Sequence, residues 1–125
     1  MILVDTSVWI DHLRRNNAQL GELLNAGRVL IHPSVIGEIA LGRMRQRHII
    51  LTALSDLTHT QVATDDEVLS LIEQEALFGR GIGYIDAHLL ASVRLTPGTT
   101  LWTLDRRLHE VAEQMGLGMK QDQDF

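Results

Sequence analysis

Short runs of branched apolar residues, each followed directly by a segment with helical spacing, alternate along this chain of 125 residues. The first run is Ile2-Leu3-Val4, and the polar residues Asp5, Thr6 and Ser7 end it before an amphipathic segment begins. A short apolar run bounded by polar turn residues predicts a buried strand. Further strands are predicted at residues 28–32, 60–64 and 99–104, with a possible short edge strand at 117–119.

The segments between these runs have apolar residues spaced three and four apart, which predicts helices. These helices are expected over residues 8–15, 20–26, 33–41, 49–54, 65–78, 84–95 and 105–115. The glycine-rich residues 79–83 predict a loop, and the polar residues 121–125 are expected to fray. Strands that alternate with helices across short connections predict an α/β fold. We expect one domain, residues 1–125, with a central parallel sheet of four to five strands and helices on both faces.

The composition, with 45% hydrophobic and 22% charged residues, is that of an ordinary globular protein. No apolar run approaches the roughly 18 residues that a membrane span needs. No basic segment followed by a long apolar region indicates a secretory signal. The chain has no cysteine, which excludes disulfides and thiolate metal sites and fits a reducing compartment. We therefore expect a cytoplasmic protein with no membrane partner.

The formal charge of −5 argues against binding nucleic acid through broad basic coverage. Ten of the eleven basic residues are arginine, which suits bidentate phosphate contact, although a high-GC genome explains the same bias more simply. The arginines cluster locally, with Arg43 and Arg45 in one group and Arg106 in another. Such groups are usually solvated surface, but they are also candidates for contacts with the phosphate backbone of a nucleic acid such as RNA.

Asp5 and Asp105 each lie directly after a predicted strand and before a predicted helix. An aspartate in this position commonly caps the helix by accepting a hydrogen bond from a free backbone N–H. The carboxyl ends of parallel strands are also where open α/β sheets bind their ligands. Taken singly, each residue is more often a cap than a ligand, and one side chain can do both.

Asp86 lies within the apolar face of its predicted helix, which is formed by Ile85, Leu89, Leu90 and Val93. A carboxylate on a core-facing stripe is costly unless it is paired or bound to a metal. The glycines before Asp86 permit close approach of other groups, which favours a ligand role over a buried pair with an arginine. Glu38, on the flank of the apolar face of its helix, is by itself an ordinary solvated acid.

If these four carboxylates converge, they need a cation. Two carboxylates about 4 Å apart repel by about 4 kcal/mol at an effective dielectric near 20. An all-oxygen ligand set suits Mg²⁺ or Mn²⁺ rather than zinc, and such a site can activate water to hydrolyse a phosphodiester. Ser7 and Thr103 lie beside two of the acids. They are either additional capping hydroxyls or hydrogen-bond partners of the attacking water.

The four acids lie in the segments Val4-Asp5-Thr6-Ser7-Val8-Trp9-Ile10, Gly37-Glu38-Ile39, Ile85-Asp86-Ala87-His88-Leu89-Leu90-Ala91 and Thr103-Leu104-Asp105-Arg106. This ordered set resembles the PIN-domain family, and is most similar to the VapC-type toxins of bacterial and archaeal toxin–antitoxin pairs. Each motif is short, but together they span nearly the whole chain in the right order.

The resemblance implies an endoribonuclease that depends on Mg²⁺ or Mn²⁺. Its catalytic and metal-binding acids would be Asp5, Glu38, Asp86 and Asp105, with Ser7 as an additional catalytic-site residue. The family also implies an RNA substrate, a homodimer, and a small cognate antitoxin protein that covers the acidic groove.

Two other interpretations remain open. A receiver-like signalling domain, phosphorylated on aspartate, has a similar length, but it normally has adjacent acids after the first strand and a lysine after the last. Here Thr6 follows Asp5, and Lys120 is the only lysine. A PIN fold without catalysis would instead act as an RNA- or partner-binding scaffold. The histidines form no i, i+4 pair, so zinc has little support, and His88 and His109 are expected on helix surfaces.

Overall fold

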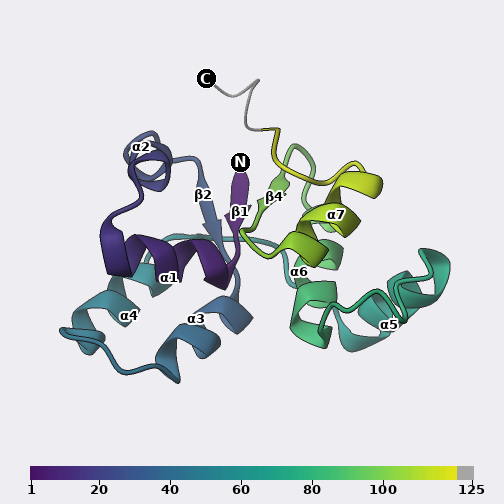
Figure 1. The fold of residues 1–125 in the computed structure, drawn as a ribbon, viewed down its shortest axis with the longest axis horizontal. Helices are drawn as coiled ribbons and strands as arrows, with labels where there is room; N and C mark the ends of the chain where they lie inside the picture. Colours follow the sequence, from purple (N-terminus) through teal and green to yellow (C-terminus); the bar gives the residue numbers. More distant parts are fainter. Residues whose placement is uncertain (121–125) are drawn as a thin grey trace.

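The computed structural model describes residues 1–120, so residues 121–125, which we expected to fray, lie outside the described residues. Strands and helices alternate along the described chain (Figure 1). The strands are β1 (Ile2–Val4), β2 (Val29–Ile31), β3 (Thr58–His59) and β4 (Thr100–Trp102). The helices are α1 (Thr6–Arg15), α2 (Ala18–Asn25), α3 (Pro33–Ala40), α4 (Arg47–Ser55), α5 (Asp65–Gln74), α6 (Tyr84–Leu95) and α7 (Arg106–Gln114).

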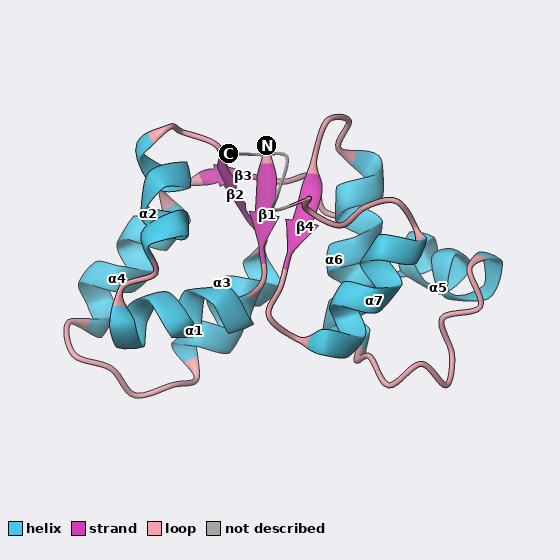
Figure 2. Ribbon diagram, turned by 45° about the horizontal axis from the view of Figure 1, so that its top comes forward, coloured by secondary structure: helices cyan, strands magenta, loops and turns pink. Residues whose placement is uncertain are grey.

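The four strands form one parallel sheet in the order β3-β2-β1-β4. The chain moves from β1 outward to β2 and β3, then returns past β1 to form β4. Because crossovers between parallel strands are right-handed, this reversal moves the later helices to the opposite side of the sheet. Figures 1 and 2 show α1 to α4 on one side and α5 to α7 on the other. The predicted α/β architecture is confirmed.

The reversal of strand order falls between β1 and β4, which is the point at which open α/β sheets bind ligands. The ends of these two strands are tied together, because the backbone N–H of Asp5 donates to the carbonyl of Trp102 at 2.9 Å. The acids that follow β1 and β4 therefore emerge side by side. The topology thus brings Asp5 close to Asp105, one hundred residues later in the sequence.

The core forms around the central strands, where every residue of β1 and β2 is buried. The tryptophans beside the site belong to this core, since Trp9 is 4% exposed and Trp102 is 3% exposed. Leu3 is fully buried at the middle of the sheet, so its truncation to alanine is expected to cost about 2–5 kcal/mol. Among the described residues, no helix is both long and apolar enough to cross a membrane.

The strand predicted at residues 60–64 is wrong, because the observed strand β3 covers only Thr58–His59. The backbone of Thr60 still bonds to the carbonyl of Ile31, at 3.0 Å. Beyond that residue no ladder partner remains on β2, since His32 and Pro33 begin the helix α3. The third strand therefore ends where its neighbour turns away.

Helix α5 ends at Gln74, four residues before its predicted end at Phe78. The chain turns at Ala76, which adopts a left-handed backbone with φ 50°. The turn buries Leu77, which is 4% exposed. At the other end of the chain, the predicted edge strand is reduced to a single parallel bridge between Leu101 and Gly118.

Candidate functional site

Four acidic residues from four different elements lie around the carboxyl ends of the central strands. This acid cluster consists of Asp5 after β1, Glu38 on α3, Asp86 in the first turn of α6 and Asp105 between β4 and α7. Burial raises the pKa of Asp86, and the negative charges of Asp5, Asp105 and Glu38 raise it further, whereas a hydrogen bond from Gly83 acts in the opposite direction. The structure therefore brings the other three predicted acids within electrostatic reach of Asp86.

Asp5 is the most buried member of the acid cluster, at 6% exposure. One of its carboxylate oxygens, Oδ2, accepts hydrogen bonds from the hydroxyls of Ser7 and Thr103, both at 2.7 Å. The same oxygen accepts a longer bond of 3.4 Å from the Ser7 backbone N–H, which caps α1. Asp5 is thus both a cap and a member of the site.

Glu38 is exposed, and its Oε1 accepts a 2.7 Å hydrogen bond from the hydroxyl of the buried Thr6. This bond ties α3 to the first turn of α1. The sequence singled out Ser7 in this segment and missed Thr6 as the residue that holds Glu38. The only clue in the sequence was that Thr6 carries a hydroxyl and directly follows Asp5. Its hydrogen bond to a residue 32 positions away is visible only in the fold.

Asp86 is partly buried, and its Oδ2 accepts a 2.9 Å bond from the Gly83 backbone N–H at the start of α6. The apolar face that we predicted around it is only partly correct, because Ile85 is 37% exposed. The buried face of α6 begins at Ala87 and continues through Leu89 and Leu90. Asp86 therefore lies at the border between the core and the site.

Asp105 caps α7, where its Oδ1 accepts bonds from the backbone N–H groups of Arg107, at 2.9 Å, and Leu108, at 3.1 Å. Its own N–H donates to the Thr103 hydroxyl at 3.0 Å. The hydroxyl of Ser7 likewise accepts a 2.9 Å bond from the Leu104 N–H. Thr103 and Ser7 therefore link the position of Asp5 to the backbone around Asp105.

The four carboxylates share one arrangement. In each, hydrogen bonds from the protein fix one oxygen, namely Oδ2 of Asp5, Oε1 of Glu38, Oδ2 of Asp86 and Oδ1 of Asp105. Within residues 1–120 the second oxygen of each accepts no hydrogen bond and forms no ion pair. The protein thus orients each acid through one oxygen and leaves the other available to an outside group.

These oxygens fit a hard divalent cation, which prefers carboxylate and water oxygens. Across residues 1–120, no three acidic or histidine side chains lie close enough together to enclose a metal ion directly. Mg²⁺ usually keeps several waters and is bound directly by only one or two carboxylates. The acid cluster can therefore serve such an ion with some of its carboxylates bonding through water.

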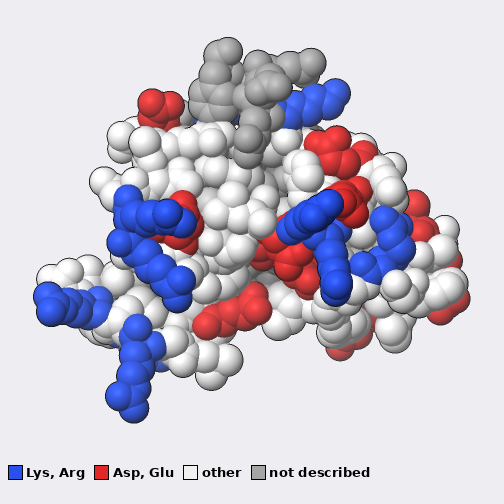
Figure 3. Space-filling model, in the orientation of Figure 1, with Lys and Arg blue, Asp and Glu red and all other residues white. Residues whose placement is uncertain are grey.

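The predicted RNA contacts Arg43 and Arg45 line a groove of about 530 Å³ that Glu38 also lines. Within residues 1–120 neither arginine forms an ion pair. Arg106, the third predicted contact, lies next to Asp105, and its Nε is 3.6 Å from Glu110. Figure 3 shows acidic side chains near the middle of this face, with arginines or lysines on both sides over α1 and α7.

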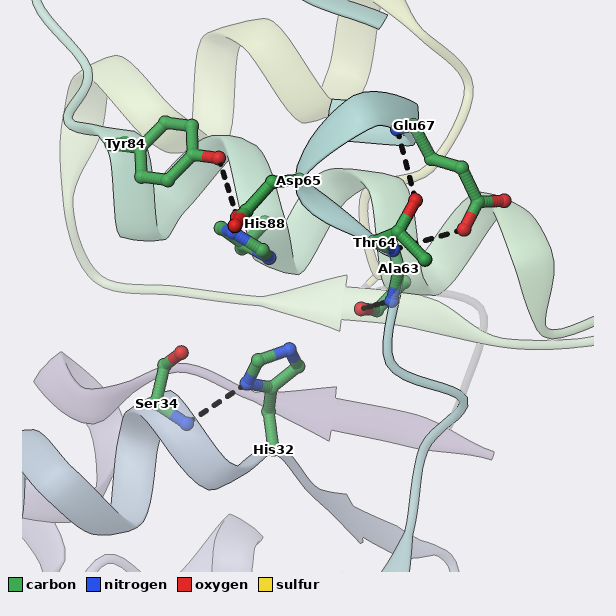
Figure 4. Close-up of polar contacts among 9 residues, drawn as sticks. His32, Ser34, Ala63, Thr64, Asp65, Glu67, Tyr84 and His88 are labelled. Carbon is green, nitrogen blue, oxygen red and sulfur yellow. Dashed lines mark hydrogen bonds and ion pairs between the residues drawn. The ribbon is translucent and has the colours of Figure 1, made fainter. Parts of the chain in front are cut away.

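A second polar group, here called the histidine cluster, contains His32, Asp65, Tyr84 and His88 (Figure 4). His32 follows β2 and is 2% exposed, and its Nδ1 accepts from the Ser34 N–H to cap α3. The surface position that we predicted for His88 is wrong, because its side chain is only 15% exposed. It packs between His32, with ring centroids 6.1 Å apart, and Asp65, whose Oδ1 lies 3.1 Å from Nε2.

Comparison with known proteins identifies the family of the chain. The family model for the PIN domain matches residues 2–114. Ribonuclease VapC32 of Mycobacterium tuberculosis, in strains CDC 1551 / Oshkosh and ATCC 25618 / H37Rv, is 48% identical to this chain over 122 residues. The alignment covers 98% of this chain and 98% of the relative. The chain belongs to the PIN-domain family, in its VapC-type group.

Proposed function

We propose that this chain is an endoribonuclease dependent on Mg²⁺ or Mn²⁺, formed by residues 1–125 as one domain. The observation that carries the proposal is the set of four convergent carboxylates, each with one oxygen held by the protein and the other free of hydrogen bonds within residues 1–120. Asp5, Glu38, Asp86 and Asp105 are the proposed metal-binding and catalytic residues. PIN-domain ribonucleases generally use divalent metal ions, and this arrangement supports the same use here.

The side chains around Asp5 prepare it for this role. The hydroxyls of Ser7 and Thr103 both donate to its Oδ2, which orients the carboxylate through that one oxygen. We propose Ser7 as a residue that orients Asp5, since its hydroxyl donates to Oδ2 at 2.7 Å. When bound, a divalent cation would lower the pKa of a water and stabilise the leaving oxygen of the phosphodiester.

Arginines on the two sides of the acid cluster are proposed to bind the RNA backbone. Arg43 and Arg45 lie along the groove that reaches Glu38, and Arg106 follows Asp105 directly. Contacts to phosphate position a nucleic acid without reading its sequence. The groove thus offers a path along which a strand of RNA can enter the acid cluster.

The similarity to Ribonuclease VapC32 also supports a biological role as the toxin of a toxin–antitoxin pair. We propose a cytoplasmic homodimer that a cognate antitoxin protein inhibits. The family assignment replaces the receiver-like interpretation, since the chain is a PIN domain. A PIN scaffold that binds RNA without cutting it is the remaining alternative.

The proposal is tested with the purified full chain and a labelled RNA. Cleavage is expected with Mg²⁺ or Mn²⁺ and is expected to stop when EDTA is added. Asp5→Asn and Asp86→Asn should abolish cleavage, whereas Asp66→Asn, which removes the same charge from the exposed start of α5, should not. Cleavage that survives in EDTA, or in the Asp5 variant, would contradict the assignment. Binding of RNA without cleavage under all conditions would favour the scaffold.

A further inference from the structure

Gly81, in the loop between α5 and α6, lies in direct contact with the side chain of Arg107 on α7. Gly81 has a left-handed backbone with φ +81°. A Cβ atom at this position would lie 2.7 Å from Nη1 and 2.8 Å from Cδ of Arg107, closer than real Cβ contacts allow. The Arg107 side chain therefore rests directly on the backbone of Gly81, and any larger residue there would displace the guanidinium.

The same loop and the same arginine are both tied to the acid cluster. Two residues after Gly81, the Gly83 N–H holds Oδ2 of Asp86. The Arg107 N–H holds Oδ1 of Asp105. Side chains on a helix point back toward its amino terminus, which for α7 is the end at Asp105. The side chain of Arg107 thus contacts the loop that anchors Asp86, and its backbone N–H anchors Asp105 at the start of α7.

The charge of Arg107 is not used inside the protein. Within residues 1–120 it forms no ion pair, whereas its neighbour Arg106 lies 3.6 Å from Glu110. A guanidinium that contacts Gly81 and pairs with no acid among residues 1–120 is available to a negatively charged ligand. Guanidinium groups bind phosphate through two parallel hydrogen bonds.

We propose that Arg107 binds a backbone phosphate of the RNA in the active site, and that Gly81 is the residue that positions it. The inference rests on the proposed ribonuclease function and adds a substrate-binding residue to it. Arg107 supplies the positive charge that RNA needs beside an acidic site, because phosphates and carboxylates repel each other. The glycine loop keeps that charge in place.

The chain contains a matched pair of glycines for the test. Gly79 lies in the same loop with φ +72°, and a Cβ there would meet nothing within 4 Å. Gly79→Ala and Gly81→Ala therefore introduce similar backbone strain, but only the second displaces Arg107. Arg107→Gln removes the guanidinium without altering the loop, and Arg107→Lys keeps the charge without the bidentate geometry. Arg28→Gln is the control for loss of a positive charge, because Arg28 precedes β2 and so lies at the amino ends of the strands, away from the acid cluster.

Two measurements report on these variants. Binding of a single-stranded RNA in EDTA is followed by fluorescence anisotropy at several KCl concentrations, and cleavage in Mg²⁺ gives kcat and KM. Arg107→Gln and Gly81→Ala are expected to weaken binding about tenfold. In Arg107→Gln the slope of log affinity against log salt should fall by about 0.7, the value for one phosphate contact on single-stranded nucleic acid. Arg107→Lys should keep most of that slope, and Gly79→Ala and Arg28→Gln should behave as the wild type.

A Gly81→Ala variant that binds and cleaves RNA like Gly79→Ala would overturn the positioning role. An unchanged salt slope in Arg107→Gln would overturn the phosphate contact. Thermal unfolding of each variant is recorded first, and if Gly81→Ala does not fold, the two Arg107 variants decide the matter. If the wild type cleaves no RNA, the proposed function fails, while the binding series in EDTA still accepts or rejects Arg107 as a phosphate contact.

Discussion

The acid cluster follows β1 and β4, and the histidine cluster begins one strand away, at His32 after β2. Both use a side chain directly after a strand to cap the next helix. The two clusters differ in the environment that they give to an ionisable side chain. Burial and the neighbouring carboxylates raise the pKa of Asp86, and yet three further acids are placed around it. Burial, followed by the charges of His88 and His59, lowers the pKa of His32 to about 4, which leaves the ring neutral.

The difference separates a site built for a ligand from a site built for stability. In the histidine cluster, Asp65 receives bonds from Tyr84 at 2.8 Å and from His88 at 3.1 Å, so its negative charge is met within the protein. The Tyr84 hydroxyl and the His88 ring lower the pKa of Asp65. In the acid cluster, no basic side chain among residues 1–120 pairs with a carboxylate, so a bound cation has to neutralise them. Polar groups at the edge of a core are costly unless they are paired. The histidine cluster pairs its groups within the protein, whereas the acid cluster leaves its carboxylates for a ligand.

The largest expected difference between the clusters is their response to Mg²⁺. A ligand that binds only the folded state at one hundred times its Kd stabilises the protein by about 2.7 kcal/mol. We expect this gain in the wild type and in His32→Asn, and no gain in Asp5→Asn. Urea unfolding with and without Mg²⁺ measures it. If Mg²⁺ raises the free energy of unfolding equally in the wild type and in Asp5→Asn, the ion binds outside the acid cluster. The two clusters would then not differ in their response to Mg²⁺.

The next effect concerns how the acid cluster is oriented. Thr103→Val removes the hydroxyl that donates to Asp5 and accepts from the Asp105 N–H, while keeping the shape of a side chain that is 5% exposed. Loss of a residue that orients a metal ligand typically costs about 10–100-fold in metal affinity or activity. RNA cleavage rates and Mg²⁺ titration measure this loss.

The matched control for Thr103→Val is Thr99→Val. Thr99 is 7% exposed, and its hydroxyl has no hydrogen-bond partner within the described residues. It should therefore lose neither activity nor metal affinity. If Thr103→Val is as active as Thr99→Val, the hydroxyl does not orient Asp5 for function.

A third effect is the pH dependence that the histidine cluster confers. Because the folded pKa of His32, about 4, lies below the usual 6.5, the unfolded chain takes up a proton first as the pH falls. This contribution to stability is complete above about pH 6.5 and is lost toward pH 4. Between pH 7.5 and 5 the loss amounts to about 2 kcal/mol.

His32→Asn is the variant that isolates this effect, because asparagine can still accept the Ser34 N–H but does not titrate. Its free energy of unfolding, from urea curves at the two pH values, should fall by about 2 kcal/mol less than that of the wild type. His48→Asn, at an exposed position on α4, should retain the wild-type pH dependence. An identical pH dependence in His32→Asn and the wild type would show that the buried ring is not the source.

The sequence alone predicts much of the fold and the acids, because these depend on local patterns. Periodicity and turn residues gave the helices and three of the four strands, and the position after a strand identified Asp5 and Asp105. The predictions that were wrong depend on contacts between residues far apart in the sequence. The third strand is shorter than predicted because β2 ends at Ile31, and no feature of residues 60–64 shows where their neighbour ends.

The same limit applies to the sites. His88 was predicted on a helix surface, whereas its burial depends on His32, 56 positions earlier, and on Asp65. The contact of Arg107 with Gly81 could not be predicted either, since the glycine-rich loop has several possible partners. Pairings across the sheet are properties of the folded chain, and a single sequence encodes them only through the complete fold.

The smallest effect has the opposite sign to that of His32. Because the folded pKa of Asp86 is raised above its usual 3.8, its ionised form destabilises the fold, and this penalty is present at neutral pH and disappears as the pH falls below about 4. Asp86→Asn keeps an acceptor for the Gly83 N–H and removes the charge. In EDTA at pH 7 it should raise the free energy of unfolding by less than about 1 kcal/mol, since the side chain is only partly buried. As the pH falls below about 4 the gain should shrink toward zero, and at no pH should the variant cleave RNA. If the variant is less stable than the wild type in EDTA at pH 7, the Asp86 carboxylate stabilises the folded state. The acid cluster would then contribute to stability as the histidine cluster does.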